Sequence, residues 1–182
     1  MKAVLFAFFL LFISLQSLYG QQKIKWMTWE EVFDKSRTEK KKIFIDVYTH
    51  WCGWCKKMDK TTFAQESIIQ YINENYFPVK FDAQYTEVVR FKGEDYQFIK
   101  QGNSGYHELA AKLLHGQMSF PSIVFLDEDF NIIQSIPGYQ DVSNFEMIAT
   151  YFAGNHHRYI PWSRYAENYK KNHSTGTSPR KN

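Results

Sequence analysis

The chain contains two cysteines, Cys52 and Cys55, with two residues between them. A disulfide between them would close a loop of only four residues, and the chain-entropy relation gives such a short loop only about 2 kcal/mol of stabilisation. A four-ligand zinc site would need more thiols or histidines than this motif supplies. Reversible thiol–disulfide chemistry therefore explains the pair better than a structural role does.

The segments around the motif are predicted to place both sulfur atoms at the start of a helix. Ile43–Tyr48 (IFIDVY) is an apolar, β-prone run of strand length, and the pattern turns helical from Cys52 through about Thr62. Unpaired N–H groups and the positive end of the helix dipole favour a thiolate there. We expect Cys52, nearer the helix end, to be the exposed attacking thiol and Cys55 to resolve the mixed disulfide.

The rest of the chain alternates between predicted helices and strands. A capping box from Thr28 to Glu31 precedes a helix that ends at about Arg37. Further helices are expected at Ser67–Asn75, Tyr106–Leu114 and Ser143–Phe152, further strands at Phe77–Asp82, Ser122–Leu126 and Ile132–Ile136, and a small hairpin at Val88–Ile99. This order is typical of an α/β fold.

Composition indicates one compact domain of ordinary globular type. Of the 182 residues, 44% are apolar and 23% are charged, which excludes a disordered, collagen-like or coiled-coil chain. The formal net charge of +3 gives no basic stripe for nucleic acid. We expect the domain to span residues 21–153. Residues 154–182 are expected to be an extension, with a short helix from Pro161 to about Lys170 and a disordered tail from Asn172.

The first 20 residues follow the order of a secretory signal peptide. Lys2 precedes an unbroken apolar run from Ala3 to Ile13, which is too short to favour a membrane span. We expect cleavage after Gly20, with an uncleaved anchor as the alternative. Export to the periplasm or out of the cell would let a disulfide persist.

The stretch Phe44–Lys56 (FIDVYTHWCGWCK), together with Phe120–Ser122 ahead of a strand, resembles the thioredoxin-like superfamily, in particular its exported bacterial members with a WCGWCK site. The resemblance covers roughly residues 26–152 and implies a thioredoxin fold, with a central mixed β-sheet flanked by helices. The sequence departs from the smallest members by an inserted segment at residues 84–105, for which the predicted hairpin accounts. It also has Trp54 where thioredoxin has proline, and this residue tunes the reduction potential.

The resemblance also implies roles for single residues. Asp46 matches a buried aspartate six residues before the first cysteine, and Pro121 matches a cis-proline that faces the disulfide. Because burial raises the pKa of a carboxyl group, Asp46 is expected to accept the proton of Cys55, unless it lies at a wet strand end. Substrate contact is assigned to the residues around the motif, the cis-proline and the last strand: Trp51, Gly53, Trp54, Phe120, Pro121 and Gly138.

Histidines are weaker candidates for the site. His107 and His115 lie eight residues apart, not at the i, i+4 spacing of a helical metal pair, so no metal site is expected. His50 either supports the thiolate with a positive charge or is a solvated turn residue.

Two functions compete at this point. The first is an exported, monomeric thiol:disulfide oxidoreductase with no cofactor beyond its own dithiol, which acts on cysteine-containing exported proteins, is recharged by a membrane electron donor and has no nucleic-acid partner. The second is a non-catalytic binding or chaperone-like module of the same fold, because fold alone does not fix function. The paired cysteines with Asp46 and Pro121 favour the enzyme, and the neutral residues between the cysteines favour a reductase, with a potential nearer about −270 mV than −120 mV.

Overall fold

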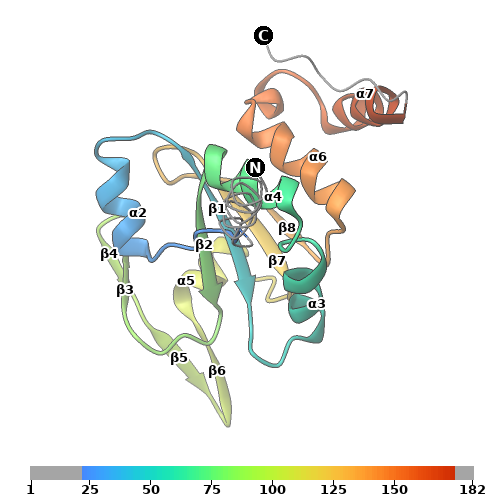
Figure 1. The fold of residues 1–182 in the computed structure, drawn as a ribbon. Coiled ribbons are helices and arrows are strands. Elements are labelled where there is room, and N and C mark those ends of the chain that lie inside the picture. Colours follow the sequence, from blue (N-terminus) through green and yellow to red (C-terminus); the bar gives the residue numbers. More distant parts are fainter. Residues whose placement is uncertain (1–21, 175–182) are drawn as a thin grey trace, which may run out of the picture.

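A four-stranded mixed sheet forms the centre of the computed structural model, which describes residues 22–174 (Figure 1). The strand order is β2-β1-β7-β8, and the strands are β1 (Lys42–Tyr48), β2 (Tyr76–Asp82), β7 (Ser122–Leu126) and β8 (Ile132–Pro137). β1 is parallel to β2 and antiparallel to β7, and β7 is antiparallel to β8. The predicted central mixed sheet is therefore confirmed, whereas the predicted signal segment lies outside the described residues.

Helices cover both faces of this sheet. They are α2 (Trp29–Ser36), α3 (Gly53–Thr61), α4 (Glu66–Asn75), α5 (Glu108–Leu113), α6 (Val142–Ala153), the 3-10 turn η2 (His156–Arg158) and α7 (Trp162–Ser174). α2 begins at the predicted capping box, in which Thr28 and Glu31 each bond the other's backbone N–H. In the part of the chain that the structure describes, no helix is both long and apolar enough to cross a membrane.

The alternation of side chains along β1 divides the core into two layers. Ile43, Ile45 and Val47 pack on one face against residues of α2 and α5, whereas Phe44 packs on the other face against residues of α3, α4 and α6. Successive residues of a strand point to opposite faces. Asp46 therefore lies on the face of Phe44, under the helix that begins at the cysteine motif.

The inserted segment forms two hairpins instead of the single predicted one. β3 (Val89–Phe91) pairs with β4 (Glu94–Tyr96), and β5 (Phe98–Gln101) pairs with β6 (Ser104–His107). The positive φ angles of Gly93 (83°) and Gly102 (57°) allow two separate tight turns. The predicted helix at Tyr106–Leu114 is therefore wrong at its start, because Tyr106 and His107 belong to β6 and the helix begins at Glu108.

His107 ends β6 and caps α5. Its Nδ1 accepts a hydrogen bond from the N–H of Leu109 (3.1 Å), and its Nε2 lies 3.1 Å from the carbonyl oxygen of Glu87. The neutral ring satisfies both contacts when Nε2 carries the hydrogen. Burial lowers the pKa of His107 from its usual 6.5.

The His107 ring predicts a pH-dependent loss of stability. Because its pKa is lower in the folded state, the unfolded chain takes up more protons as the pH falls below about 6.5, so folding weakens there. Asparagine caps helices without titrating. Urea unfolding between pH 8 and pH 5 should therefore show wild type losing stability relative to His107→Asn as the pH falls. A difference that stays constant over this range would contradict the prediction.

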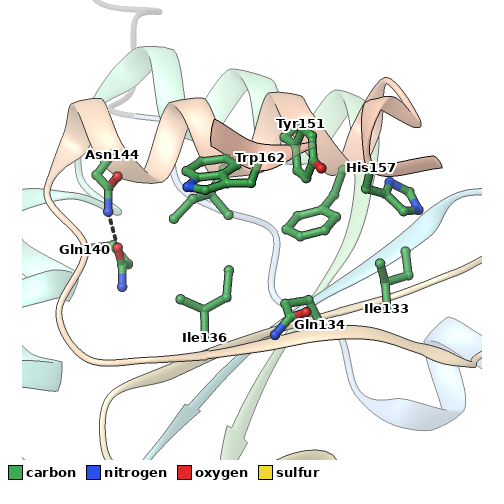
Figure 2. A pocket seen from close by; sticks show the side chains of 10 residues that line it. Ile133, Gln134, Ile136, Gln140, Asn144, Tyr151, His157 and Trp162 are labelled. Atoms are coloured by element: carbon green, nitrogen blue, oxygen red, sulfur yellow. Dashed lines mark hydrogen bonds between the residues drawn. The ribbon is translucent and has the colours of Figure 1, made fainter. Parts of the chain in front are cut away.

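The C-terminal extension packs on α6. The Tyr165 hydroxyl donates to Thr150 Oγ1 (2.9 Å), and the Tyr151 ring contacts those of Trp162 and Tyr165. The helix continues through Ser174, so residues 172–174 belong to it and the predicted start of the tail is wrong; residues 175–182 lie outside the described part. A cavity of about 640 Å³ separates α6 from β8, and Trp162 lies along its α6 side (Figure 2).

Candidate active site

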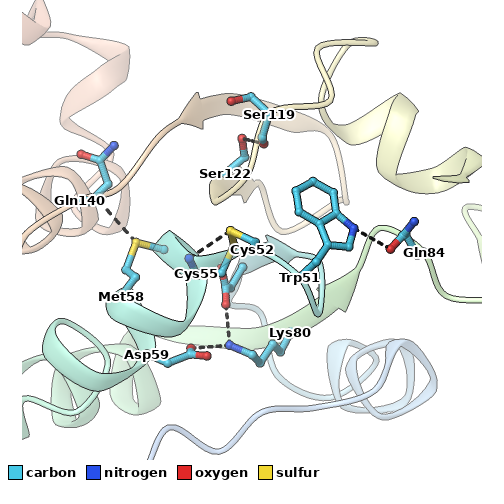
Figure 3. The surroundings of a disulfide bond; sticks show 11 residues. Trp51, Cys52, Cys55, Met58, Asp59, Lys80, Gln84, Ser119, Ser122 and Gln140 are labelled. Carbon is cyan, nitrogen blue, oxygen red and sulfur yellow. Dashed lines mark hydrogen bonds and ion pairs between the residues drawn. A yellow bond between two sulfur atoms is a disulfide. The ribbon is translucent and has the colours of Figure 1, made fainter. Parts of the chain in front are cut away.

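The two cysteines form a disulfide at the N-terminus of α3 (Figure 3). Cys52 is the N-cap residue, and its Sγ accepts a hydrogen bond from the backbone N–H of Cys55 (3.0 Å). The Cys52 N–H in turn donates to the carbonyl oxygen of Thr49 (3.1 Å). This confirms that the motif places its sulfur atoms where the helix end favours a negative charge.

One expectation about the motif is wrong in this oxidised form. Cys52 is only 5% exposed and Cys55 is 3% exposed, so the two differ little and neither is open to solvent. The neighbouring tryptophans are exposed instead: Trp51, which precedes the motif, is 67% exposed and Trp54, between the cysteines, is 57% exposed. The assignment of Cys52 as the attacking thiol therefore depends on its position at the helix end and not on exposure.

Asp46 is a buried acid near the middle of β1. It is 1% exposed, which excludes the wet strand end, and within the described residues its Oδ1 has no hydrogen-bond partner. Its Oδ2 accepts a hydrogen bond from Lys80 Nζ (2.7 Å). Burial raises the pKa of Asp46 to about 6, because desolvation outweighs the attraction of the Lys80 ammonium. A carboxyl group with this pKa can exchange a proton near neutral pH.

Lys80 was missed in the sequence and is central to this arrangement. It lies on β2 directly across from Asp46, and its ammonium also pairs with Asp59 of α3 (Figure 3). The neighbouring carboxylates raise the pKa of Lys80 despite the opposing effect of burial. A lysine inside the apolar run FPVKFD is as unusual as Asp46 in its own strand, and that anomaly is the signal in the sequence.

The predicted cis-proline is confirmed, because the Phe120–Pro121 peptide bond is cis. The loops that carry Pro121 and Gly138 are joined by a hydrogen bond from the Gly138 N–H to the Pro121 carbonyl oxygen (2.8 Å). Gly138 has a φ of 92°, a backbone conformation that residues other than glycine rarely adopt.

Ring contacts bring both loops against the cysteine motif. Phe120 meets Trp51 edge to face with ring centroids 5.9 Å apart, and Tyr139 lies 5.5 Å from Trp54. Lys57 places its ammonium over both the Trp54 and Tyr139 rings, at 4.5 and 5.2 Å. The residues assigned to substrate contact therefore surround one small surface at the start of α3.

Gln140 holds the loop after β8 on α3, a contact that sequence reasoning missed. Its backbone N–H donates to Met58 Sδ (3.4 Å), and its carbonyl oxygen accepts from the Thr62 hydroxyl (2.7 Å).

Gly53 has open space around it, with no atom within 4 Å of the position that a Cβ would take. A substrate backbone can therefore approach Gly53 closely.

The candidate histidine beside the motif, His50, is paired with a carboxylate. His50 is exposed, and its Nε2 lies 3.0 Å from Asp82 Oδ2, so a positive charge on its ring is matched by that carboxylate. Within residues 22–174, no group of three or more histidine, cysteine, aspartate or glutamate side chains could hold a metal ion. The groups placed to stabilise the thiolate are those of the helix end, where the Cys55 N–H bonds to Cys52 Sγ.

Comparison with known proteins assigns the fold family. A family model described as the thioredoxin-like domain matches residues 29–153, so the chain belongs to the thioredoxin-like domain family. This fold, together with the Cys52–Cys55 pair, supports a thiol–disulfide oxidoreductase-type role. The match agrees with the resemblance that the motif suggested.

Individual proteins are similar to the chain over part of its sequence or in fold. Spermatogenesis-associated protein 20 of Homo sapiens is 37% identical over 67 residues, which is 36% of this chain but only 8% of that protein's length. A thioredoxin-fold protein from Helicobacter pylori has a TM-score of 0.59 at 16% identity, over 76% of this chain and 87% of that chain. A thioredoxin from Thermus thermophilus has a TM-score of 0.53 at 11% identity, over 71% and 87%.

Proposed function

We propose that the protein is an exported thiol:disulfide oxidoreductase that reduces or exchanges disulfides of exported, cysteine-containing proteins. The observation that carries this proposal is the Cys52–Cys55 disulfide at the start of α3, on the sheet face where Asp46 is buried with a raised pKa. A structural disulfide would need neither the helix end nor a titrating acid.

The reaction begins with the reduced protein. The Cys52 thiolate attacks one sulfur of the substrate disulfide, so a mixed disulfide forms and the first substrate thiolate leaves. Cys55 then gives its proton to Asp46, and the Cys55 thiolate attacks Cys52 Sγ. The second substrate thiolate leaves with the electron pair of the broken bond, and the protein retains the Cys52–Cys55 disulfide, while two electrons have passed to the substrate.

A membrane dithiol donor is proposed to return the disulfide to the reduced state, with no cofactor beyond the two cysteines. We also propose that the protein is a monomer and has no nucleic-acid partner. Its net charge of +3 is in keeping with the second point. Export is supported by the apolar run of residues 3–13. Trp51, Gly53, Trp54, Phe120, Pro121 and Gly138 are proposed to contact the substrate.

The direction of electron flow is predicted by the charges near the sulfur atoms. Strong oxidants of this fold have a strongly stabilised reduced form. Gly53 and Trp54 add no charge between the cysteines, and His50 is paired with Asp82. We therefore expect a low potential, nearer about −270 mV than −120 mV.

Equilibration with defined ratios of reduced and oxidised glutathione or dithiothreitol, followed by alkylation of free thiols and mass measurement, gives this potential. The same alkylation in acid-quenched cells should find both cysteines mainly as free thiols. A potential near the oxidising end, with the pair oxidised in cells, would instead indicate a disulfide-forming enzyme.

A further inference from the structure

A cleft of about 460 Å³ lies beside the disulfide, between the cysteine motif and the second inserted hairpin. Trp51 and Phe120 line it on the side of the motif, and residues of β5, β6 and α5 line it on the other. The hairpin projects past the lower end of β1 in Figure 1, the end from which the chain continues into α3. The inserted segment thus builds one wall of a cleft next to the reactive pair.

Gln84 connects the two walls. Its Oε1 accepts a hydrogen bond from Trp51 Nε1 (2.9 Å; Figure 3). Its Nε2 donates to the Ser104 hydroxyl and to the Gly105 carbonyl oxygen, each at 3.3 Å. One side chain therefore fixes the position of the hairpin relative to the residue that precedes Cys52.

The lining shows which chemistry the cleft accommodates. Trp51, Met118 and Phe120 supply apolar surface. Neutral polar side chains such as Gln84, Gln101 and Ser104 complete the lining, and none of the described residues that line the cleft carries a charge. Thr49 also lines it; this residue is 1% exposed, and its hydroxyl has no hydrogen-bond partner within residues 22–174. Because that hydroxyl is itself buried, a ligand in the cleft meets the uncharged side chains around it instead.

Two residues that line the cleft are close to Cys52 in the sequence. Thr49 and Trp51 both lie within three residues of Cys52, and the Thr49 carbonyl oxygen accepts the Cys52 N–H. An extended polypeptide advances about 3.3 Å per residue. A substrate segment held at the disulfide therefore reaches the cleft with a residue close to its own cysteine.

We infer that this cleft binds a large, uncharged apolar side chain of the substrate polypeptide, at a position within about three residues of its reacting cysteine. The inference rests on the proposed function, since it names the substrate feature that the same site selects. An ionised side chain would lose its hydration in the cleft without meeting an opposite charge, so acidic and basic residues are disfavoured there. The inserted segment thereby gives the protein a preference for apolar sequence around a disulfide.

The test compares two peptide disulfides that differ only in whether the residues next to cysteine are phenylalanine or aspartate. The measured quantity is the ratio of second-order rate constants for their reduction by the prereduced protein. We expect a ratio of at least about ten in favour of phenylalanine, because burial of a large apolar side chain is worth that factor or more. The reduction of 2-hydroxyethyl disulfide, which has no side chain for the cleft, is measured in parallel.

A matched pair of variants on β5 tests where the preference arises. Gln101 lines the cleft, whereas Lys100 precedes it on the same strand, is exposed and is not among the lining residues. Neighbouring strand residues point to opposite faces. Gln101→Trp should fill the cleft and bring the ratio close to one, and Lys100→Trp should leave it unchanged.

Each outcome separates the inference from the proposed function. A ratio near one in the unmodified protein, an undiminished ratio in Gln101→Trp, or an equal loss in both variants would overturn the inference. Failure of the prereduced, unmodified protein to reduce 2-hydroxyethyl disulfide or either peptide would instead overturn the proposed function. Reduction of the small disulfide with no preference between the peptides leaves the proposed function in place and removes only the cleft from it.

Discussion

Cys52→Ser is expected to abolish disulfide reduction, and Cys55→Ser is expected to hold the protein in a mixed disulfide through Cys52. The reason is the geometry at the start of α3, where Cys52 is the N-cap residue and Cys55 lies one turn inside the helix. Without Cys52 the attacking thiolate at the helix end is missing. Without Cys55 the thiol that releases the substrate is missing.

Both effects can be measured with one assay. Reduction of insulin disulfides gives the loss of turnover, and mass spectrometry of Cys55→Ser after reaction gives an adduct that dithiothreitol removes. The double variant Cys52→Ser/Cys55→Ser is the control and should form no adduct. If instead Cys52→Ser accumulated the adduct through Cys55, and Cys55→Ser did not, the assigned roles would be reversed.

Asp46→Asn is expected to stabilise the protein at pH 8 by about 3 kcal/mol, which is the order of magnitude implied by a shift of about two pKa units. Burial raises the pKa of Asp46 from 3.8 to about 6, so ionisation of this carboxyl costs folding free energy. Between pH 3.8 and about pH 6 the folded state binds more protons than the unfolded chain. The contribution of Asp46 to the free energy of unfolding therefore falls as the pH rises. Asparagine removes that cost.

Urea unfolding of wild type and Asp46→Asn at pH 8 and at pH 3.5 measures this effect. The gain should be large at pH 8 and should nearly vanish at pH 3.5, where Asp46 is protonated in the folded state and mostly protonated in the unfolded chain. Asp59→Asn is the matched control, because Asp59 pairs with the same Lys80 but is part-exposed, so its gain should be much smaller. Equal gains for the two variants at pH 8 would contradict the assignment of the cost to burial.

The same Asp46→Asn variant is expected to exchange disulfides more slowly near neutral pH. Asparagine cannot take the proton that Cys55 releases. The change should therefore appear in the resolving step, as a longer-lived mixed disulfide, while the first attack by Cys52 is little affected. A gain in stability without slower resolution would place Asp46 outside the proton path.

The elements that position the cysteines follow from local sequence. β1, α3 and the capping box of α2 depend on neighbouring residues, and each was predicted to within about one residue of its observed bounds. Asp46 could also be predicted as buried, since the residues on either side of it form a continuous apolar run. The cis peptide before Pro121 came from the family resemblance and not from any local pattern.

The features that the sequence did not predict depend on which segments meet. The role of Lys80 depends on the register between β1 and β2, which puts it across from Asp46. The ring contacts of Trp51 and Trp54 depend on loops that are distant in sequence, those carrying Phe120 and Tyr139. The second hairpin depends on a short turn at Gly102, whose β-strands are too short to give a clear alternation.

The packing of the C-terminal extension on α6 has a consequence for how the protein can be attached to a surface. α7 has 13 residues, so it is about 20 Å long. In Figure 1 it lies at the top of the molecule, whereas α3 begins near the bottom. A support or fusion partner joined through α7 would therefore be held away from the disulfide, and the surface around the cysteine motif would stay accessible to large substrates. An attachment through the β5–β6 hairpin would instead crowd the face on which those substrates must dock.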